Sequence, residues 1–373
     1  MSSSTPSSKV NIIIIGGGLI GPRHALSIIS NPSTHLLALI DPAPHGPETA
    51  SSLSTHHFPS IASLLSSCLP KPDAAIICTP NKTHVPIALE LIAAGIHILV
   101  EKPISTSIPE GLALIAAARE KGVKVLAGHH RRFNPYLLAA KKALDESSLG
   151  QVVAVQGTWC LRKPAAYYDG IGEWRKSGES GGVVLINLVH EVDLLQYLLG
   201  PITIVSAVET VRTRGFDAEE GAAIILRFES GVVGTFLLSD STPSPWNFEG
   251  GTGENPMIPQ VRDEDAAGGF YRIMGTNGSL SVPDLMRWTG EWNEKPGKEG
   301  LEVQKEIVPF DKQIEHFARV VRGSERPRCT AEEALSAMVV CEAVKEAMRS
   351  GLWVEINEFE VNVRGASLIE SRT

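Results

Sequence analysis

The chain has 373 residues and a formal net charge of −8 at pH 7, and 43% of its residues are hydrophobic. Domains cluster near roughly 100 to 150 residues, so a chain of this length is expected to form two. The composition excludes a wholly disordered or fibrous chain. The acidic balance, without any run rich in lysine and arginine, argues against nucleic acid or a membrane surface as the main partner and favours a small-molecule substrate.

Cysteine usage and the chain ends indicate where the protein works. The five cysteines contain no C-x-x-C pair, and their odd number argues against a complete disulfide framework, which favours a reducing compartment. No stretch of about 18 apolar residues could span a bilayer, and residues 1–8 lack a hydrophobic signal core. We therefore expect a cytoplasmic protein with a disordered leader at residues 1–8 and a tail at residues 366–373.

Residues 9–128 alternate short β-branched runs with amphipathic or alanine-rich segments, a pattern typical of strand–helix–strand units on a parallel sheet. Nearly continuous apolar strands suit a sheet that helices cover on both faces. A doubly wound parallel sheet is predicted for this domain. The expected strands are Val10–Ile15, His35–Ile40, Ala74–Cys78, His97–Val100 and Lys124–Leu126, and the expected helices include Val85–Ala94 and Pro109–Glu120.

The pattern changes in residues 129–365, the expected second domain, where strands follow one another with short turns between them. This predicts a mostly antiparallel sheet within an α/β domain. Such a sheet usually has one face covered by a second subunit, so a homodimer or homotetramer is expected. The expected strands are Gln151–Trp159, Ile202–Arg212, Ala222–Phe228 and Val232–Leu238.

Three later segments complete the predicted organisation. Residues Ser241–Gly269 are rich in glycine and proline, and loops of this length are usually binding loops, lids or disordered segments. Helices are expected at Asp311–Arg322 and Thr330–Ser350. Thr330 is the predicted N-cap of the second helix, because Glu333 stands at the capping-box position.

A glycine turn follows the first predicted strand. Gly16, Gly18 and Gly21 satisfy G-x-G-x-x-G, and Leu19 and Ile20 complete the turn before a helix. The first glycine would permit the tight turn, the second a close approach of backbone to pyrophosphate, and the third close helix–strand packing. The alternative is a plain glycine-rich loop.

Asp41 favours the functional interpretation. It ends the second predicted strand, 20 residues after Gly21, where a carboxylate can accept hydrogen bonds from both ribose hydroxyls of NAD. The same carboxylate would repel the 2′-phosphate of NADP. The sequence therefore predicts NAD as the cofactor, with NADP as the alternative.

Two short motifs follow the next strands, at the sheet edge where ligands of open α/β sheets bind. Thr79, Pro80 and Asn81 could line the nicotinamide ribose, or they could simply form a turn. Lys102 follows another strand in Glu101-Lys102-Pro103. A lysine placed there can polarise a carbonyl or hold an alkoxide, although a solvated turn is the simpler interpretation.

A second polar group lies on a predicted helix that follows Gly181-Gly182. Asn187, His190 and Asp193 are spaced three residues apart and would project from nearly one face. A lone histidine in this setting is most often structural. With polar neighbours to orient it, His190 could instead accept or donate a proton near neutral pH.

These motifs occur in an order that resembles one known family. The motifs are Gly16–Gly21 with His24, Cys78–Asn81 with His84, Glu101–Pro103, and the His190–Asp193 segment. Together they resemble the glucose–fructose oxidoreductase / inositol dehydrogenase (Gfo/Idh/MocA) family over nearly the whole chain. The resemblance implies a Rossmann domain, then an α/β domain with an open, mostly antiparallel sheet, and substrates that are commonly sugars, cyclitols and related polyols.

The resemblance also assigns roles by position. Lys102 matches the family's motif lysine and His190 its acid/base histidine. His84, Glu101 and Lys102 also join the expected cofactor-binding residues. Many members carry an aspartate four residues before the histidine, where this chain has Ile186. Asn187, the nearest polar residue, cannot take a proton, so His190 would work with Lys102, Asp193 or water.

Substrate contacts are expected from side chains that mix aromatic and polar character, because sugar rings combine apolar faces with hydroxyl groups. Packing in the core or between subunits is the alternative for each aromatic residue. No metal is expected at His129-His130, because adjacent residues on a strand face opposite sides. Beside Lys102, Asn187 and His190, the candidates are His130, Arg131, Tyr168, Trp174, Arg175 and Trp246.

The sequence thus predicts a dehydrogenase that moves a hydride between nicotinamide and a carbinol carbon of a sugar, cyclitol or related polyol. One alternative is a redox-neutral enzyme that recycles bound NAD during epimerisation or elimination, or an imine reductase. Another is a dinucleotide-binding sensor without catalysis.

Overall fold

The computed structural model describes residues 9–261 and 269–356. The chain divides into two compact units. Unit 1 comprises Met1–Phe133 and Ile307–Leu335, and unit 2 comprises Asn134–Glu306 and Ser336–Thr373. The predicted leader at residues 1–8 and the tail at residues 366–373 lie outside the described residues.

Unit 1 contains a parallel sheet of six strands in the order β3-β2-β1-β4-β5-β6. This is the doubly wound order, in which the order of strand addition reverses between β1 and β4, and ligands of such sheets bind at the carboxyl ends of the strands there. The predicted fold of this domain is confirmed. The strands are β1 (Val10–Ile15), β2 (Thr34–Ile40), β3 (His56–Phe58), β4 (Ala74–Ile77), β5 (His97–Val100) and β6 (Val125–Ala127).

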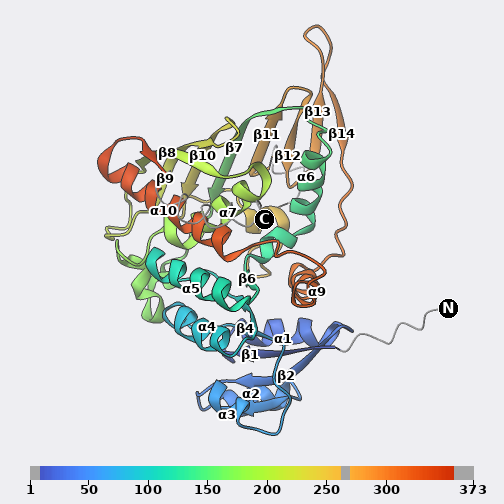
Figure 1. The fold of residues 1–373 in the computed structure, drawn as a ribbon. Coiled ribbons are helices and arrows are strands. Elements are labelled where there is room, and N and C mark those ends of the chain that lie inside the picture. Colours follow the sequence, from blue (N-terminus) through green and yellow to red (C-terminus); the bar gives the residue numbers. More distant parts are fainter. Residues whose placement is uncertain (1–8, 262–268, 357–373) are drawn as a thin grey trace, which may run out of the picture. The chain divides into compact units, whose positions relative to one another are not determined.

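Helices connect these strands, and α4 packs against α5 beside the sheet (Figure 1). Ser107 caps α5, where its hydroxyl accepts the backbone N–H of Glu110, and Gly122 ends the helix in the left-handed conformation at φ 63°. The helices are α1 (Gly21–Ser30), α2 (Gly46–Ser52), α3 (Ile61–Leu65), η1 (Asn81–Thr83), α4 (His84–Ala93), α5 (Ile108–Lys121), η2 (His130–Phe133) and α9 (Pro309–Val321).

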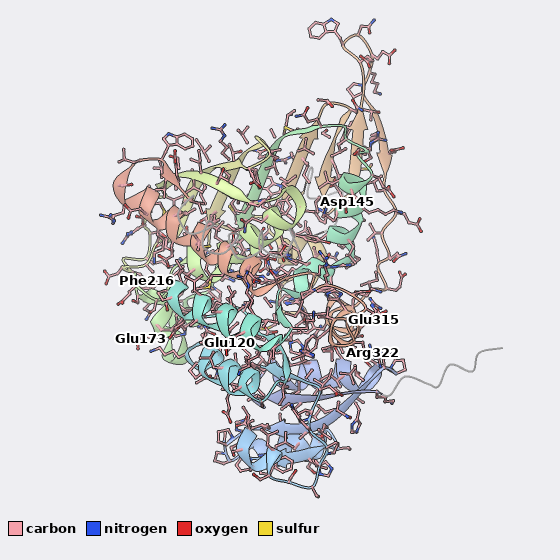
Figure 2. The ribbon with its side chains drawn as sticks, viewed as in Figure 1. Glu120, Asp145, Glu173, Phe216, Glu315 and Arg322 are labelled. Carbon is pink, nitrogen blue, oxygen red and sulfur yellow. The ribbon has the colours of Figure 1, made fainter. Side chains whose placement is uncertain are left out.

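Helix α9 completes the core of unit 1 although it lies far along the chain. Ile314 and Phe317 are fully buried in a cluster with Ile12 and Leu126 of the sheet. Glu315 lies on the same helix and Arg322 is its C-cap, and Figure 2 labels both polar residues. The amphipathic pattern of α9 therefore supplies the apolar layer that the sheet needs.

Residues His130–Phe133 form a turn of 3-10 helix. The prediction that His129-His130 lies on a strand is therefore wrong, because β6 already ends at Ala127.

Unit 2 contains a mixed sheet in the order β14-β13-β12-β11-β7-β10-β9-β8-β15. Among the described strands of this second sheet, only β7 and β10 pair in parallel, and all other pairs are antiparallel. The predicted mostly antiparallel sheet is therefore confirmed. The strands are β7 (Val152–Cys160), β8 (Ile202–Glu209), β9 (Gly221–Phe228), β10 (Val233–Ser239), β11 (Tyr271–Gly275), β12 (Gly278–Val282), β13 (Met286–Thr289), β14 (Gly297–Gly300) and β15 (Val354–Glu355).

The remaining helices belong to unit 2, apart from the first turn of α10. The predicted capping box is confirmed, since Glu333 N–H donates to Thr330 Oγ1 at 3.2 Å and Thr330 N–H to Glu333 Oε2 at 2.9 Å. No helix in the described ranges is long and apolar enough to cross a membrane. The helices are α6 (Pro135–Asp145), η3 (Ala165–Tyr168), η4 (Gly170–Lys176), η5 (Val184–Leu188), α7 (Val189–Leu199), α8 (Phe248–Thr252) and α10 (Ala331–Ser350).

The predicted long loop at Ser241–Gly269 includes regular structure. It contains the short helix α8, which Asn247 caps by accepting the backbone N–H of Gly250 at 2.7 Å. Residues 262–268 of this segment lie outside the described part of the chain.

Candidate active site

The glycine turn joins β1 to α1, and its outer glycines occupy positions where no other residue fits. Gly16 has φ +99°, and a Cβ there would lie 2.8 Å from Cys78 O at the end of β4. A Cβ on Gly21 would lie 2.0 Å from Gly16 O. The first glycine therefore makes the tight turn and the third permits close packing, as the sequence predicts.

The middle of the turn is open. A Cβ on Gly18 would meet nothing within 4 Å, and Leu19 is 95% exposed. Ile20 is the N-cap of α1 and has no side chain that could cap the helix. The first N–H groups of α1 can therefore bind an anion, which fits the pyrophosphate of a dinucleotide.

Asp41 is fixed beside this turn at the end of β2. Its Oδ2 accepts the backbone N–H of Gly17 at 2.6 Å, and its Oδ1 accepts that of Ala43 at 2.8 Å. The residue is buried, and a Cβ on Gly17 would come within 3.0 Å of Oδ2. These two hydrogen bonds thus hold the Asp41 carboxylate in one orientation beside Gly17 of the turn.

Three residues follow β4 at the same sheet edge. Thr79 Oγ1 accepts the hydroxyl of Thr83 at 2.8 Å, and Pro80 and Asn81 are exposed. His84 is buried behind them, with its ring nitrogens 2.8 Å from Thr79 O and 2.8 Å from Pro103 O. His84 thereby links the loops that follow β4 and β5, and a direct contact of His84 with a cofactor remains a prediction.

Glu101 follows β5 and pairs with His24 of α1, with Oε1 2.7 Å from Nε2 in the interior. Burial raises the pKa of Glu101, but the hydrogen bond and charge of His24 outweigh burial and lower that pKa to about 2. The pair ties the helix of the glycine turn to the loop that carries Lys102. Lys102 itself is half-buried, and its bond to Pro103 is cis.

Two further candidates of unit 1 follow β6. His130 stacks on Phe310 of α9, with 4.4 Å between the ring centroids, and Arg131 is buried. The turn that carries His130 and Arg131 packs against α9. The sequence did not predict that α9 belongs to unit 1.

Asn187, His190 and Asp193 are all buried in unit 2, with 8%, 7% and 1% exposure. His190 and Asp193 lie on α7, but Asn187 lies in a π-helical turn, η5, directly before it. A π-helical turn changes the angular spacing of side chains, so the prediction of one continuous α-helical face is wrong at Asn187. Such turns occur frequently at functional sites.

A pocket in unit 2 brings together three of the predicted substrate-binding residues, Tyr168, Arg175 and Asn187. Ile186 lines the same pocket. Trp174 and Trp246 are 44% and 43% exposed and do not line it. Figure 2 labels Phe216, another lining residue. The remaining lining residues are Tyr167, Gly182, Arg214, Ala218, Glu219, Glu220 and Asp240.

Much of the charge in this pocket is internally paired. Arg214 Nη1 lies 2.6 Å from Asp240 Oδ1 and 3.7 Å from Glu220 Oε2. Asp240 also accepts the hydroxyl of Tyr168 at 2.5 Å. Burial and this hydrogen bond raise the pKa of Tyr168, so the phenol stays protonated. Glu220 accepts the N–H and hydroxyl groups of Thr213 at 2.9 Å and 2.6 Å.

Glu219 holds the backbone at the start of η5. Its Oε1 accepts the N–H of Val184 at 3.0 Å, and a Cβ on Gly182 would lie only 2.1 Å from that oxygen. Burial raises the pKa of Glu219. Glu219, Arg214 and Asp240 are absent from the sequence-based candidates. The only sequence signal was the position of two of them near strand ends, because Glu219 lies two residues before β9 and Asp240 directly follows β10.

Comparison with known proteins identifies the family. Residues 10–129 match the oxidoreductase family described as the Gfo/Idh/MocA NAD-binding Rossmann fold, and residues 141–356 match the C-terminal alpha/beta domain of the same family. The scyllo-inositol 2-dehydrogenase (NAD(+)) of Bacillus subtilis is 26% identical over 94% of this chain and 97% of the relative.

Two further proteins share this organisation. The levoglucosan dehydrogenase of Pseudarthrobacter phenanthrenivorans is 27% identical over 73% of each chain. The WlbA dehydrogenase of Bordetella pertussis, solved with NADH and UDP-GlcNAcA, superimposes with a TM-score of 0.72 at 21% identity and covers 94% of this chain and 99% of its own. The chain therefore belongs to the Gfo/Idh/MocA family, and it is an NAD(P)-dependent oxidoreductase.

Proposed function

We propose that this enzyme transfers a hydride between C4 of nicotinamide and a carbinol carbon of a sugar, cyclitol or related polyol. The observation that carries the proposal is the match of both domains to the Gfo/Idh/MocA oxidoreductase family, and Tyr168, Arg175 and Asn187 line a small pocket in unit 2. Hydrogen-bonding groups beside aromatic faces suit a polyol. Relatives named for inositol and levoglucosan support this substrate class.

The cofactor, when bound, accepts or returns the hydride. The open position at Gly18 and the N–H groups at the start of α1 would hold its pyrophosphate, and Asp41 would accept the ribose hydroxyls. Thr79, Pro80 and Asn81 would line the nicotinamide ribose. Because Asp41 is a fixed, buried carboxylate, we assign NAD as the preferred cofactor over NADP.

In the oxidative direction, the substrate C–H bond breaks with its electron pair and the hydroxyl loses its proton. We assign the proton to His190 and the stabilisation of the developing oxygen charge to Lys102, as the family resemblance implies. Asn187 and Asp193 would orient the substrate and the imidazole. In the reductive direction, His190 returns the proton to the same oxygen.

Separate alanine substitutions of Lys102 and His190 test these roles. Each is expected to lower kcat with the best polyol at least about a hundredfold, because general acid–base catalysis contributes roughly 10²- to 10⁴-fold. The melting temperature of each variant, and NADH binding by His190→Ala, should match wild type. Full activity of both variants would contradict the proposal.

The aliphatic Ile186, four residues before His190, favours one second candidate, a sensor that binds the dinucleotide without turnover. Tight NADH binding combined with no oxidation or reduction across polyols, keto sugars and imines would support the sensor. Cofactor that stays bound while a substrate epimerises or eliminates, without net NADH, would instead indicate a redox-neutral enzyme.

The open face of the unit 2 sheet supports assembly into a homodimer or homotetramer. Ile225 of β9 and Val233 and Leu237 of β10 are 45%, 50% and 47% exposed, and they alternate with buried residues along each strand. An apolar sheet face of this kind is expected to be covered by a second copy. No disulfide joins any of the five cysteines, all of which lie in the described ranges, and this supports the reducing, cytoplasmic location.

A further inference from the structure

Arg175 is held in a fixed orientation at the wall of the unit 2 pocket. Its guanidinium stacks on Tyr167, 4.1 Å from the ring centroid, and its Nη1 donates to Tyr167 O at 2.8 Å. Trp174 is also close, with 5.2 Å between its ring centroid and the guanidinium carbon. A Cβ on Gly172 would lie 2.3 Å from Nη1, so the backbone also passes close to the group. A planar group fixed in this way is prepared to bind a ligand with little loss of entropy.

Arg175 also lacks a compensating charge within the part of the chain that the structure describes. Its Nε is buried and has no hydrogen-bond partner there, and no described carboxylate lies within ion-pair distance. A buried N–H of a charged group without an acceptor is costly, so an acceptor is expected to come from a ligand.

The second arginine of the pocket provides a contrast. Arg214 is paired with Asp240 and Glu220, and both carboxylates accept further hydrogen bonds from their neighbours. Arg214 is thus neutralised inside the protein, whereas the positive charge of Arg175 remains for a ligand.

The acidic residues limit which anion fits. Asp240 and Glu220 keep negative charge at the pocket wall, so a dianionic phosphate would be repelled more strongly than a monoanion. A carboxylate carries one charge and matches the paired N–H groups of a guanidinium.

We propose that Arg175 binds the carboxylate of the substrate, so that the preferred substrates are polyhydroxy acids such as uronates and aldonates. This inference rests on the proposed hydride transfer and narrows its substrate class. Tyr168 and Asn187, which line the same pocket, would contact the hydroxyl groups of the acid.

The test compares kcat/KM with NAD for four groups of substrates: hexuronates and aldonates, neutral sugars and inositols, amino sugars, and sugar phosphates. Wild type should prefer the acids by about 10- to 100-fold, because hydrogen bonds to charged groups contribute at roughly this level. Arg175→Gln should remove the preference for acids over neutral substrates, and Arg175→Lys should retain part of it. Arg349→Gln, at an exposed arginine of α10 paired with Glu346, is the matched control and should behave as wild type.

A binding measurement separates this inference from the proposed function. Calorimetric titration of the NADH complex with a hexuronate should show binding that Arg175→Gln weakens by the same factor, whether or not turnover occurs. If the acid binds in an Arg175-dependent way but no substrate is turned over, the hydride-transfer proposal would be overturned and the carboxylate site would stand. Turnover of neutral polyols that equals turnover of acids, or a preference for amino sugars or sugar phosphates, would overturn the carboxylate site alone.

Discussion

The backbone N–H of Gly17 donates a hydrogen bond to Asp41 Oδ2 at 2.6 Å, which places a buried carboxylate directly beside the glycine turn. The turn and the second strand are thereby connected before any dinucleotide arrives. Because Ala43 N–H holds the other oxygen, the carboxylate cannot readily turn away from an incoming ribose.

Asp41→Ala is expected to shift the ratio of kcat/KM with NAD to that with NADP towards NADP by about 10- to 100-fold, since it removes both an acceptor for the ribose hydroxyls and a repulsive charge. Steady-state kinetics with both cofactors provide the measurement. Asp145→Ala, at an exposed position of α6 labelled in Figure 2, is the control. A wild type that already prefers NADP would contradict the assignment.

Glu101→Gln is expected to destabilise the protein by about 2 to 3 kcal/mol at pH 7, because the folded-state pKa of about 2 lies below the ordinary value of 4.5. A lowered carboxyl pKa stabilises the fold above pH 4.5, and this contribution is lost as the pH falls from 4.5 towards 2. Urea unfolding at pH 7 and pH 4 measures the difference, with the exposed Glu120→Gln on α5 as control. If the difference in unfolding free energy between wild type and Glu101→Gln does not decrease at low pH, the result would contradict the pairing of Glu101 with His24.

Glu219→Gln should show the opposite pH dependence. Burial raises the pKa of Glu219 above 4.5, so its ionisation costs stability as the pH rises through and beyond that value. The amide oxygen of Gln can still accept Val184 N–H. The variant should therefore be at least as stable as wild type at pH 7 and converge with it at pH 4. Thermal unfolding across this range is the measurement, and marked destabilisation at pH 7 would contradict it.

Gly182→Ala is expected to be severely destabilising, by about 3 kcal/mol or more. Its φ of +87° disfavours any side chain, and the new Cβ would lie 2.1 Å from Glu219 Oε1. Chemical denaturation checks this, and Gly231→Ala, where φ is +88° but the Cβ meets nothing within 4 Å, isolates the steric part. If Gly182→Ala and Gly231→Ala lose the same unfolding free energy, the contact with Glu219 contributes nothing to the destabilisation.

Leu237→Glu is expected to dissociate the assembly, because it places a charge at the centre of the exposed apolar face of β10. Light scattering coupled to size exclusion measures the mass. Leu352→Glu, at a 68% exposed residue beyond α10, should leave the mass unchanged. A wild-type monomer would contradict the expected oligomer.

Local signals predicted much of the fold. The run of isoleucines in Val10–Ile15 specified β1 to the residue, and Thr330 with Glu333 predicted the start of α10. Both depend on interactions close in sequence, which a periodic pattern or a cap residue reports directly.

Long-range arrangements were beyond such signals. The periodicity of Asp311–Arg322 predicted a helix, but not that Ile314 and Phe317 would fill the core of unit 1. The change of helical spacing at Asn187 had no sequence marker. Asp240 and Glu219 join the candidate pocket only because strands β9 and β10 pair, and pairing partners cannot be read from composition.

The central claim is hydride transfer from a carbinol carbon to nicotinamide. The most direct measurement uses the best substrate of the panel with deuterium at its reacting carbon, followed by mass spectrometry of the NADH formed. The account predicts one deuterium at C4 of nicotinamide, formed more slowly than with the protiated substrate. If NADH forms without deuterium, or if no substrate of the panel transfers deuterium to the cofactor, the proposed hydride transfer is contradicted.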